Sequence, residues 1–191
     1  MVAPINRIHP EILALIPDYW WETPSRDQHI IALTHVCRAW RELFVSRSSL
    51  WTNIDCDNVK KAEVYLKRSK SSPVDMALIR SESPLPYDPF FRIIPLDIGR
   101  LESIYIEGTR ENLEEITAHL TRPAPLLEEL FIYGGTHGAP NLNSILSPTL
   151  FNKDLSSLCQ LSLESVRTEL PWRNMANLTR FMLTNTSSVS M

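Results

Sequence analysis

The sequence of 191 residues has few cysteines, little net charge and no long apolar run. Its three cysteines, Cys37, Cys56 and Cys159, are odd in number and widely scattered. This pattern argues against a disulfide framework and is typical of a reducing compartment. The formal net charge of −3 argues against a dedicated nucleic-acid binder. No run of about eighteen apolar residues occurs, so we expect no membrane span.

The N-terminal stretch also lacks the features of a secretory signal peptide. Prolines, Asp18 and Glu22 interrupt its apolar residues, and no small-residue cleavage site follows them. We therefore expect a cytoplasmic or nuclear protein whose partners include neither a membrane nor a nucleic acid.

Residue patterns for catalysis or metal binding are missing too. The five histidines show no ligand spacing and no Cys-x-x-Cys occurs, so we expect no zinc or other cofactor. Cys37 is two residues from His35, which places the two side chains on different helix faces, and a thiol on the apolar stripe would be inert. Gly134 and Gly135 lack the lysine and Ser/Thr of a phosphate loop, and we interpret them as a turn. The sequence favours a protein that is not an enzyme.

Residues 5–56 have a helical pattern. Pro10 begins a short apolar turn, and Ser25 with Gln28 has the spacing of a capping box. Apolar residues at intervals of three and four then predict one helix or two consecutive short helices: Ile30, Leu33, Val36, Cys37, Trp40, Leu43 and Phe44. About fifty residues in short helices bury only a small core, so this segment is expected to lean on a neighbour or a partner.

The next segment, 57–72, is predicted to be a linking helix that begins at Asp57. Its apolar face is formed by Val59, Ala62, Tyr65 and Leu66. Its basic residues are interpreted as a solvated face and not as a phosphate-binding site.

Residues 73–191 repeat the pattern apolar-x-x-apolar-x-apolar at intervals of 20 to 31 residues. The copies begin at Pro73, Leu101, Leu127, Leu158 and Leu178. Between the second and third copies, Thr109 can cap a helix that buries Leu113, Ile116 and Leu120. A strand and a returning helix at this period predict a leucine-rich-repeat-like region, in which neighbouring units stack into one core.

The usual Asn or Cys of such repeats is replaced by Thr109, Gly135, Val166 and Thr186, so the solenoid is expected to be irregular. The proline-rich segment 81–99 carries apolar residues and is expected to pack onto the repeats. The pattern stops soon after Leu183, which suggests an array that continues or is sealed by another element. The fold class expected is α+β or α/β, with a small three-helix module followed by short parallel strands and helices.

Alternation along the strands predicts which residues face away from the core. We expect substrate contacts at Tyr105, Glu107, Phe131, Tyr133, Ser162 and Met182.

Three pieces of the first segment resemble the F-box, a three-helix module. They are "IHPEILALI", "DQHIIALTHVCRAWRELF" and "SLW", which are similar in order and spacing to the Leu-Pro-x-Glu start, Val-Cys-x-x-Trp centre and Leu-Trp end of that family. "VYLKRSKSSP" and "LPWRNM" also resemble the large F-box families of mushroom-type fungi. His9 stands where the family has a proline, and Pro10 follows it.

The resemblance implies that 5–56 is an F-box domain that docks on the small adaptor of a cullin-type SCF ubiquitin ligase, while the repeats hold a substrate protein. It implies adaptor contacts at Ile8, Pro10, Glu11, Ile12, Leu13, Ile16, Val36, Cys37 and Trp40. From the residues alone, Ile12 and Ile16 fit the core as well as an interface, and the stripe position of Trp40 favours the core. The alternative function is a leucine-rich-repeat binding module that recruits no ligase.

Overall fold

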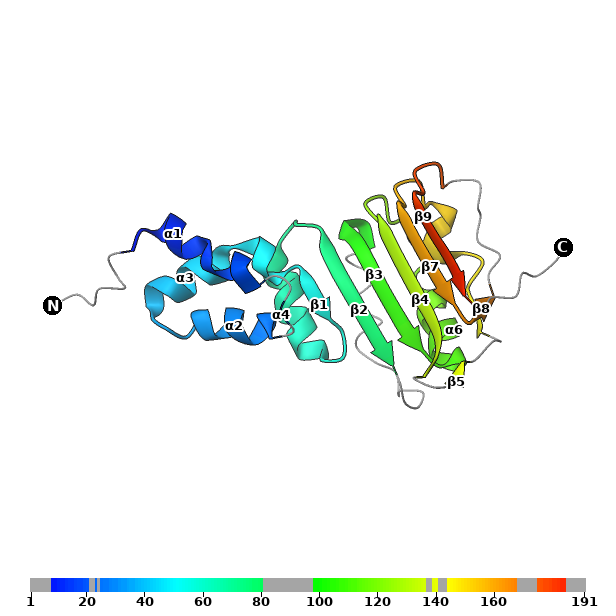
Figure 1. Ribbon diagram of the computed structural model, residues 1–191, viewed down its shortest axis with the longest axis horizontal. Helices are drawn as coiled ribbons and strands as arrows, with labels where there is room; N and C mark the ends of the chain where they lie inside the picture. The colour runs from blue at the N-terminus through cyan, green and yellow to red at the C-terminus, as the bar shows by residue number, and fades with distance from the viewer. Residues whose placement is uncertain are drawn as a thin grey trace.

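The computed structural model describes residues 8–20, 23, 25–80, 98–136, 139–140, 144–167 and 175–184. The molecule is elongated, with short helices at one end and a sheet at the other (Figure 1). Most of the proline-rich segment predicted to pack onto the repeats lies outside the described residues, which resume at Ile98, a buried side chain.

The N-terminal end, residues 8–51, is called the helical module below. It consists of α1 (Pro10–Ala14), η2 (Ile16–Trp20), α2 (Arg26–Leu33), α3 (Arg38–Ser46) and η3 (Ser48–Trp51). The apolar stripe predicted from the sequence is therefore divided between two helices. Four of its residues are buried in the core: Ile30, Leu33, Trp40 and Phe44.

Two local predictions for this module are wrong. Ser25 is the N-cap residue of α2 but makes no capping hydrogen bond, because its hydroxyl lies 3.4 Å from Nδ1 of His29 instead. Cys37 was placed on the helical stripe, yet it is the extended N-cap residue of α3 and is half-buried. The turn between α2 and α3 interrupts the helical period that the sequence suggested.

The rest of the chain is built on one parallel sheet. Its strands follow chain order: β1 (Asn53–Asp55), β2 (Val74–Arg80), β3 (Leu101–Gly108), β4 (Glu129–Thr136), β7 (Gln160–Glu164) and β9 (Arg180–Thr184). Every neighbouring pair in this order is parallel. The combination of helices with a parallel sheet confirms the α/β expectation.

The remaining elements are short or connect the strands. They are α4 (Val59–Ser69), η4 (Ile98–Arg100), α6 (Arg110–His119), β5 (Ala139–Pro140), β6 (Ser144–Ile145), η5 (Leu150–Lys153) and β8 (Val166–Arg167). Strand β5 pairs antiparallel with the end of β4, and β6 pairs with β8 in a separate small sheet.

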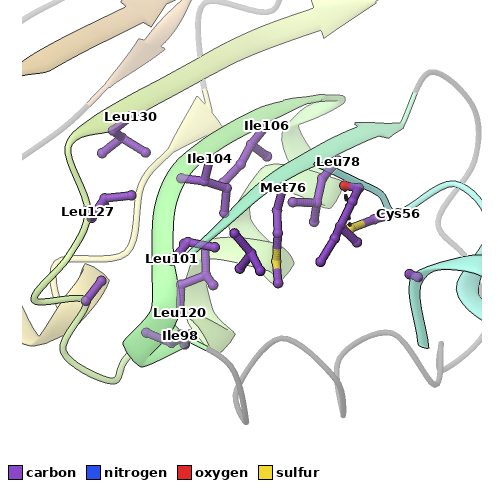
Figure 2. Packing of buried hydrophobic residues seen from close by; sticks show 14 of the residues in the cluster. Cys56, Met76, Leu78, Ile98, Leu101, Ile104, Ile106, Leu120, Leu127 and Leu130 are labelled. Atoms are coloured by element: carbon purple, nitrogen blue, oxygen red, sulfur yellow. Dashed lines mark hydrogen bonds between the residues drawn. The ribbon is translucent and has the colours of Figure 1, made fainter. Parts of the chain in front are cut away.

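The register of the sheet aligns the repeated apolar positions. One level contains Met76, Ile104, Leu130, Leu161 and Phe181, and the next contains Leu78, Ile106, Ile132, Leu163 and Leu183. Met76, Leu78, Ile104, Ile106 and Leu130 are among the buried side chains in Figure 2, whereas Phe181 and Leu183 on the edge strand β9 are exposed. Strand β1 adds a row that the sequence pattern did not predict, since Ile54 pairs with Met76. In that row Trp51 and Cys56 occupy the positions that leucines hold elsewhere, and both are buried.

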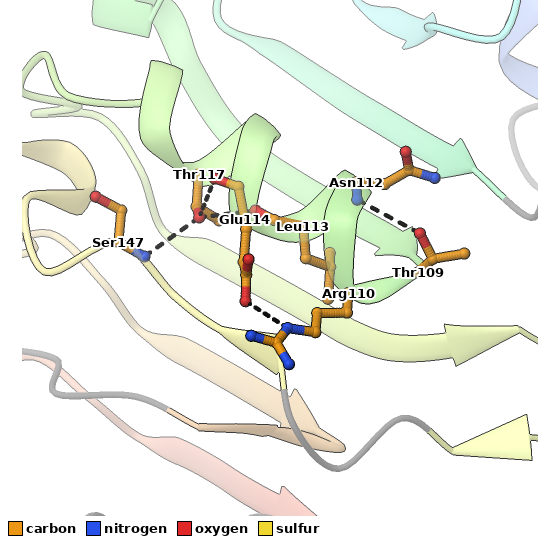
Figure 3. A network of polar contacts seen from close by, with 7 residues as sticks. All are labelled: Thr109, Arg110, Asn112, Leu113, Glu114, Thr117 and Ser147. Atoms are coloured by element: carbon orange, nitrogen blue, oxygen red, sulfur yellow. Dashed lines mark hydrogen bonds and ion pairs between the residues drawn. The ribbon is translucent and has the colours of Figure 1, made fainter. Parts of the chain in front are cut away.

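Helix α6 covers one side of the sheet, as predicted. Leu113, Ile116 and Leu120 are buried, and the Thr109 hydroxyl accepts a hydrogen bond from the Asn112 amide at 3.4 Å (Figure 3). The Thr117 hydroxyl donates to the carbonyl of Leu113. Helix α4 buries Ala62, Tyr65 and Leu66 of its predicted face and half-buries Val59, and its cap is Asn58 and not Asp57.

The interpretation of Gly134 and Gly135 as a turn is wrong, because both lie within strand β4. A Cβ atom on Gly134 would lie 2.4 Å from the carbonyl oxygen of Ser165. Glycine is therefore needed where the backbone of β4 passes the residue before β8.

Candidate interaction surfaces

The helical module is fastened to the sheet by a cluster of aromatic residues around Trp51. The Trp51 indole donates a hydrogen bond to the Phe44 carbonyl at 3.0 Å. Its ring packs edge-on against Tyr65 of α4, and the Arg68 guanidinium lies 4.3 Å from its centroid. One apolar core consequently runs from Leu13 in the module to Val166 at the far side of the sheet.

Charged groups strengthen the same junction. The ammonium of Lys61 in α4 lies 2.6 Å from the Asp27 carboxylate of α2 and 3.6 Å from Asp55 of β1. Burial alone would lower the pKa of Lys61, but the hydrogen bond and charge of Asp27 outweigh it and the pKa is raised. Three elements are thereby joined through one ammonium group.

Hydrogen bonds near η3 join the two parts a second time. The Ser72 hydroxyl donates to Ser48 at 2.8 Å, and the ammonium of Lys70 donates to the Ser46 carbonyl at 3.0 Å. Arg100 donates to the Ser69 hydroxyl and the Ser72 carbonyl. The module and the sheet are thus held in one fixed arrangement.

Several apolar side chains of the helical module are exposed to solvent. We call them the apolar set of the module: Ile8, Ile12, Leu15, Tyr19, Ile31 and Val36. Ile12 is 58% exposed and Val36 is 51% exposed. Both belong to a module that has only a small core of its own. Contiguous exposed apolar patches mark protein-binding surfaces, and these six side chains are the exposed large apolar residues from which the described part of the module could form one.

The residues expected to contact an adaptor therefore fall into three groups. Ile8, Pro10, Glu11, Ile12 and Val36 are exposed, Ile16 and Cys37 are half-buried, and Leu13 and Trp40 are core residues at 6% and 5% exposure. Leu15, Tyr19 and Ile31 are exposed apolar residues that the sequence interpretation missed. Periodicity places residues on a face, but it does not reveal which face the neighbouring helices cover.

The second surface is the outer face of the sheet, the side opposite the core. Tyr105, Phe131 and Tyr133 form a row of aromatic rings there, with the Tyr105 centroid 6.5 Å from Phe131 and 5.1 Å from Tyr133. The Tyr105 hydroxyl donates to Glu107 at 2.7 Å. Burial and this carboxylate both raise the pKa of Tyr105. The hydroxyls of Tyr133 and Ser162 lie 3.4 Å apart.

All six residues predicted to face outward lie at outer-face positions of the register, since they alternate with the buried levels. Their accessibility differs, however. Met182 is 61% exposed and the three aromatic rings are half-buried, whereas Glu107 and Ser162 are buried by their neighbours. Only part of the predicted set can reach a partner directly.

A hollow of about 390 Å³ opens beside the aromatic row. Its lining includes Phe131, Tyr133, Gln160, Ser162, Arg180 and Met182. Neither Gln160 nor Arg180 was predicted as a contact residue. Each lies at the start of its strand, before the positions on which the prediction was based.

The outer face is rich in carboxylates. The register places Asp55, Asp75, Glu107, Glu129 and Glu164 on it, whereas Arg180 is the one cation that the described strands contribute to this face. Lys61 and Arg26 act on Asp55 and Asp75 from the neighbouring helices. Burial raises the pKa of Asp75 to about 6, and the charges of Glu102 and Glu129 act in the same direction. Arg26 opposes this effect. The pKa of Asp75 is therefore raised mainly by burial, and negative charge at this side of the sheet adds to the effect.

Within the described ranges, no group of three or more His, Cys, Asp and Glu side chains could hold a metal ion. In the same ranges no helix is both long enough and apolar enough to span a bilayer. Comparison with known proteins finds no matching family model, no similar curated protein and no similar solved structure. The function is therefore inferred from the two surfaces themselves.

Proposed function

We propose that the chain is a substrate-receptor subunit of a cullin-type SCF ubiquitin ligase. In this proposal the helical module is an F-box that binds the small adaptor, and the parallel strands with their helices are an irregular leucine-rich-repeat-like solenoid that binds a substrate protein. The chain itself carries out no chemistry. In this proposal the protein acts in the cytoplasm or the nucleus.

The observation that carries the proposal is the exposure of Ile12 and Val36 in a module whose motifs resemble the F-box. More than half of each of these apolar side chains is left in water. Burying such side chains against a partner removes apolar surface at roughly 25 cal/mol per Å². Helices α1, α2 and α3 lie at the end of the molecule away from strands β3 to β9, which leaves the sheet free for a second partner (Figure 1).

The fixed junction between the two parts supports the same function. A receptor must hold its substrate at a defined position relative to the ligase, and a flexible linker would not do so. The Trp51 cluster and the Lys61 ion pairs connect the module to the first strands without such a linker.

The proposal is tested by capturing the purified chain on the ligase's small adaptor. Ile12→Asp places a charge on an exposed apolar position and should abolish capture without unfolding the chain. Val64→Asp is the matched control, because Val64 is also exposed but lies on α4, outside the module. Circular dichroism of each variant checks folding. Equal capture of the folded Ile12→Asp variant and the wild type would reject adaptor binding through this surface.

A further inference from the structure

We propose that the outer face of the sheet binds an extended, basic segment of the substrate protein, with two cationic side chains about four residues apart and an apolar side chain between them. This inference rests on the proposed function for its biological setting, since it names the kind of substrate a receptor would hold. The binding itself requires only the sheet.

The first argument is the arrangement of aromatic rings and carboxylates. Tyr105 and Tyr133 pack at 5.1 Å, and Glu164 pairs with Tyr133 in the register of β4 and β7. The charge of Glu164 also reaches Tyr105, where it contributes to the raised pKa of that phenol. A lysine or arginine side chain at this point would meet the negative faces of aromatic rings and a carboxylate together.

The second argument is charge complementarity. Glu129 and Glu164 have no ion-pair partner among the described residues, whereas Asp55 is already close to Lys61. Glu129 also acts on Asp75, whose ionisation it disfavours. A cation bound here would relieve this repulsion, while the phosphates of a nucleic acid would increase it. The partner that fits is therefore a basic protein segment.

The third argument is spacing. Glu129 and Tyr133 are four residues apart on β4, which is about 13 Å along the strand. Because Glu164 lies beside Tyr133, the two free carboxylates mark the ends of this interval. An extended segment would place cationic residues over Glu129 and Glu164 when they are about four positions apart.

The hollow lies at the middle of the interval. Phe131 is halfway between Glu129 and Tyr133, and it lines the hollow together with Ser162 and Met182. A residue between the two cations could insert an apolar side chain there. The surface thus combines a central apolar contact with charged positions on either side, which is the arrangement found in specific protein interfaces.

The test uses the full chain without adaptor and a fluorescein-labelled peptide, Gly-Arg-Ser-Leu-Ser-Arg-Gly, in fluorescence anisotropy. The control peptide replaces both arginines with glutamate. We expect the basic peptide to bind at least about tenfold more tightly than the acidic one, with an affinity that falls as salt rises. Equal binding of both peptides, or no binding of the basic one, overturns the inference.

Variants locate the site. Glu129→Gln and Glu164→Gln each keep the side-chain shape and should weaken binding about fivefold. Glu63→Gln is the matched control, because Glu63 is an exposed carboxylate on α4 that lies away from the outer face. If the peptide binds but neither outer-face variant weakens it, the assignment to this face is wrong.

Each of the two proposals can be rejected without rejecting the other. Adaptor capture of Glu129→Gln and Glu164→Gln should equal that of the wild type, because both positions lie in the sheet. Loss of peptide binding with intact adaptor capture therefore rejects only the substrate class. Peptide binding by a folded chain that captures no adaptor rejects only the ligase function.

Discussion

The ring of Trp51 stands edge-on to the ring of Tyr65, with centroids 5.0 Å apart and an interplanar angle of 83°. Trp51 ends the helical module and also begins the row of buried residues that contains Ile54 and Cys56. One side chain therefore belongs to both parts of the molecule. This relationship explains why the module and the sheet share a single core.

Replacing Trp51 by alanine should destabilise both parts together. Removing a buried tryptophan costs roughly 3–5 kcal/mol, and the Phe44 carbonyl would also lose its donor. Urea unfolding followed separately by far-UV circular dichroism and tryptophan fluorescence should give one transition at lower urea in the variant. Trp51→Phe keeps the apolar contact and should lose less. Unfolding of the variant in two separate steps, with the sheet as stable as before, would contradict a shared core.

The strand crossing at Gly134 gives a second stability prediction. Gly134→Ala introduces a methyl group at 2.4 Å from the Ser165 carbonyl oxygen, so the backbone must shift, at a cost of about 1–3 kcal/mol. Gly99→Ala is the matched control, because no atom lies within 4 Å of the added Cβ. Thermal unfolding of the two variants should show a lower Tm only for Gly134→Ala. Equal Tm values would show that β4 does not approach Ser165 as closely as described.

The carboxylates of the outer face predict a pH dependence of stability. The pKa of Asp75 is raised to about 6 in the folded chain, so the folded state holds this proton more tightly than the unfolded state. The associated stability is present below the pKa of an ordinary aspartate, about 4, and is lost as the pH rises through 6. Asp75→Asn should remove this loss and stabilise the chain at pH 7 by about 1–2 kcal/mol, a value reduced for partial solvent screening.

Urea unfolding of the wild type and Asp75→Asn between pH 4 and pH 7.5 measures this difference. The two curves should converge near pH 4, separate as the pH rises towards 6, and stay apart by a constant amount above pH 6. Glu102→Gln removes one of the charges acting on Asp75 and should move the separation to lower pH. A constant offset between the curves at every pH would mean that the ionisation of Asp75 is not involved.

Much of the sheet could be predicted from the sequence. The apolar pattern that begins at Leu101, Leu127 and Leu158 has the same three-residue form in each copy, and the register aligns these copies. The copy around Ile54 escaped prediction because a tryptophan and a cysteine take the positions of leucines. Trp51 is held by tertiary contacts with Phe44 of α3 and Tyr65 of α4, which the apolar pattern does not reveal.

The two interaction surfaces were harder to predict from the sequence than the sheet. Alternation assigned Glu107 and Ser162 correctly to the outer side, but their burial depends on neighbours such as Tyr105 and Tyr133. Similarly, a period of three or four placed Leu13 with Ile12 in one helix, and only the packing of α3 decides that Leu13 is buried and Ile12 exposed. The exposed fraction of a side chain is set by tertiary contacts, and these cannot be read from the residues next to it in the sequence.

The proposed function depends on adaptor binding by the helical module, which a calorimetric titration of the full chain with the purified small adaptor measures. We expect a saturable one-to-one complex for the wild type, with a negative heat-capacity change from burial of Ile12 and Val36. Ile12→Asp and Val36→Asp should each abolish the heat of binding, while Val64→Asp should match the wild type. A folded wild-type chain that gives no binding heat at any temperature, and forms no complex on size-exclusion chromatography, would contradict the claim.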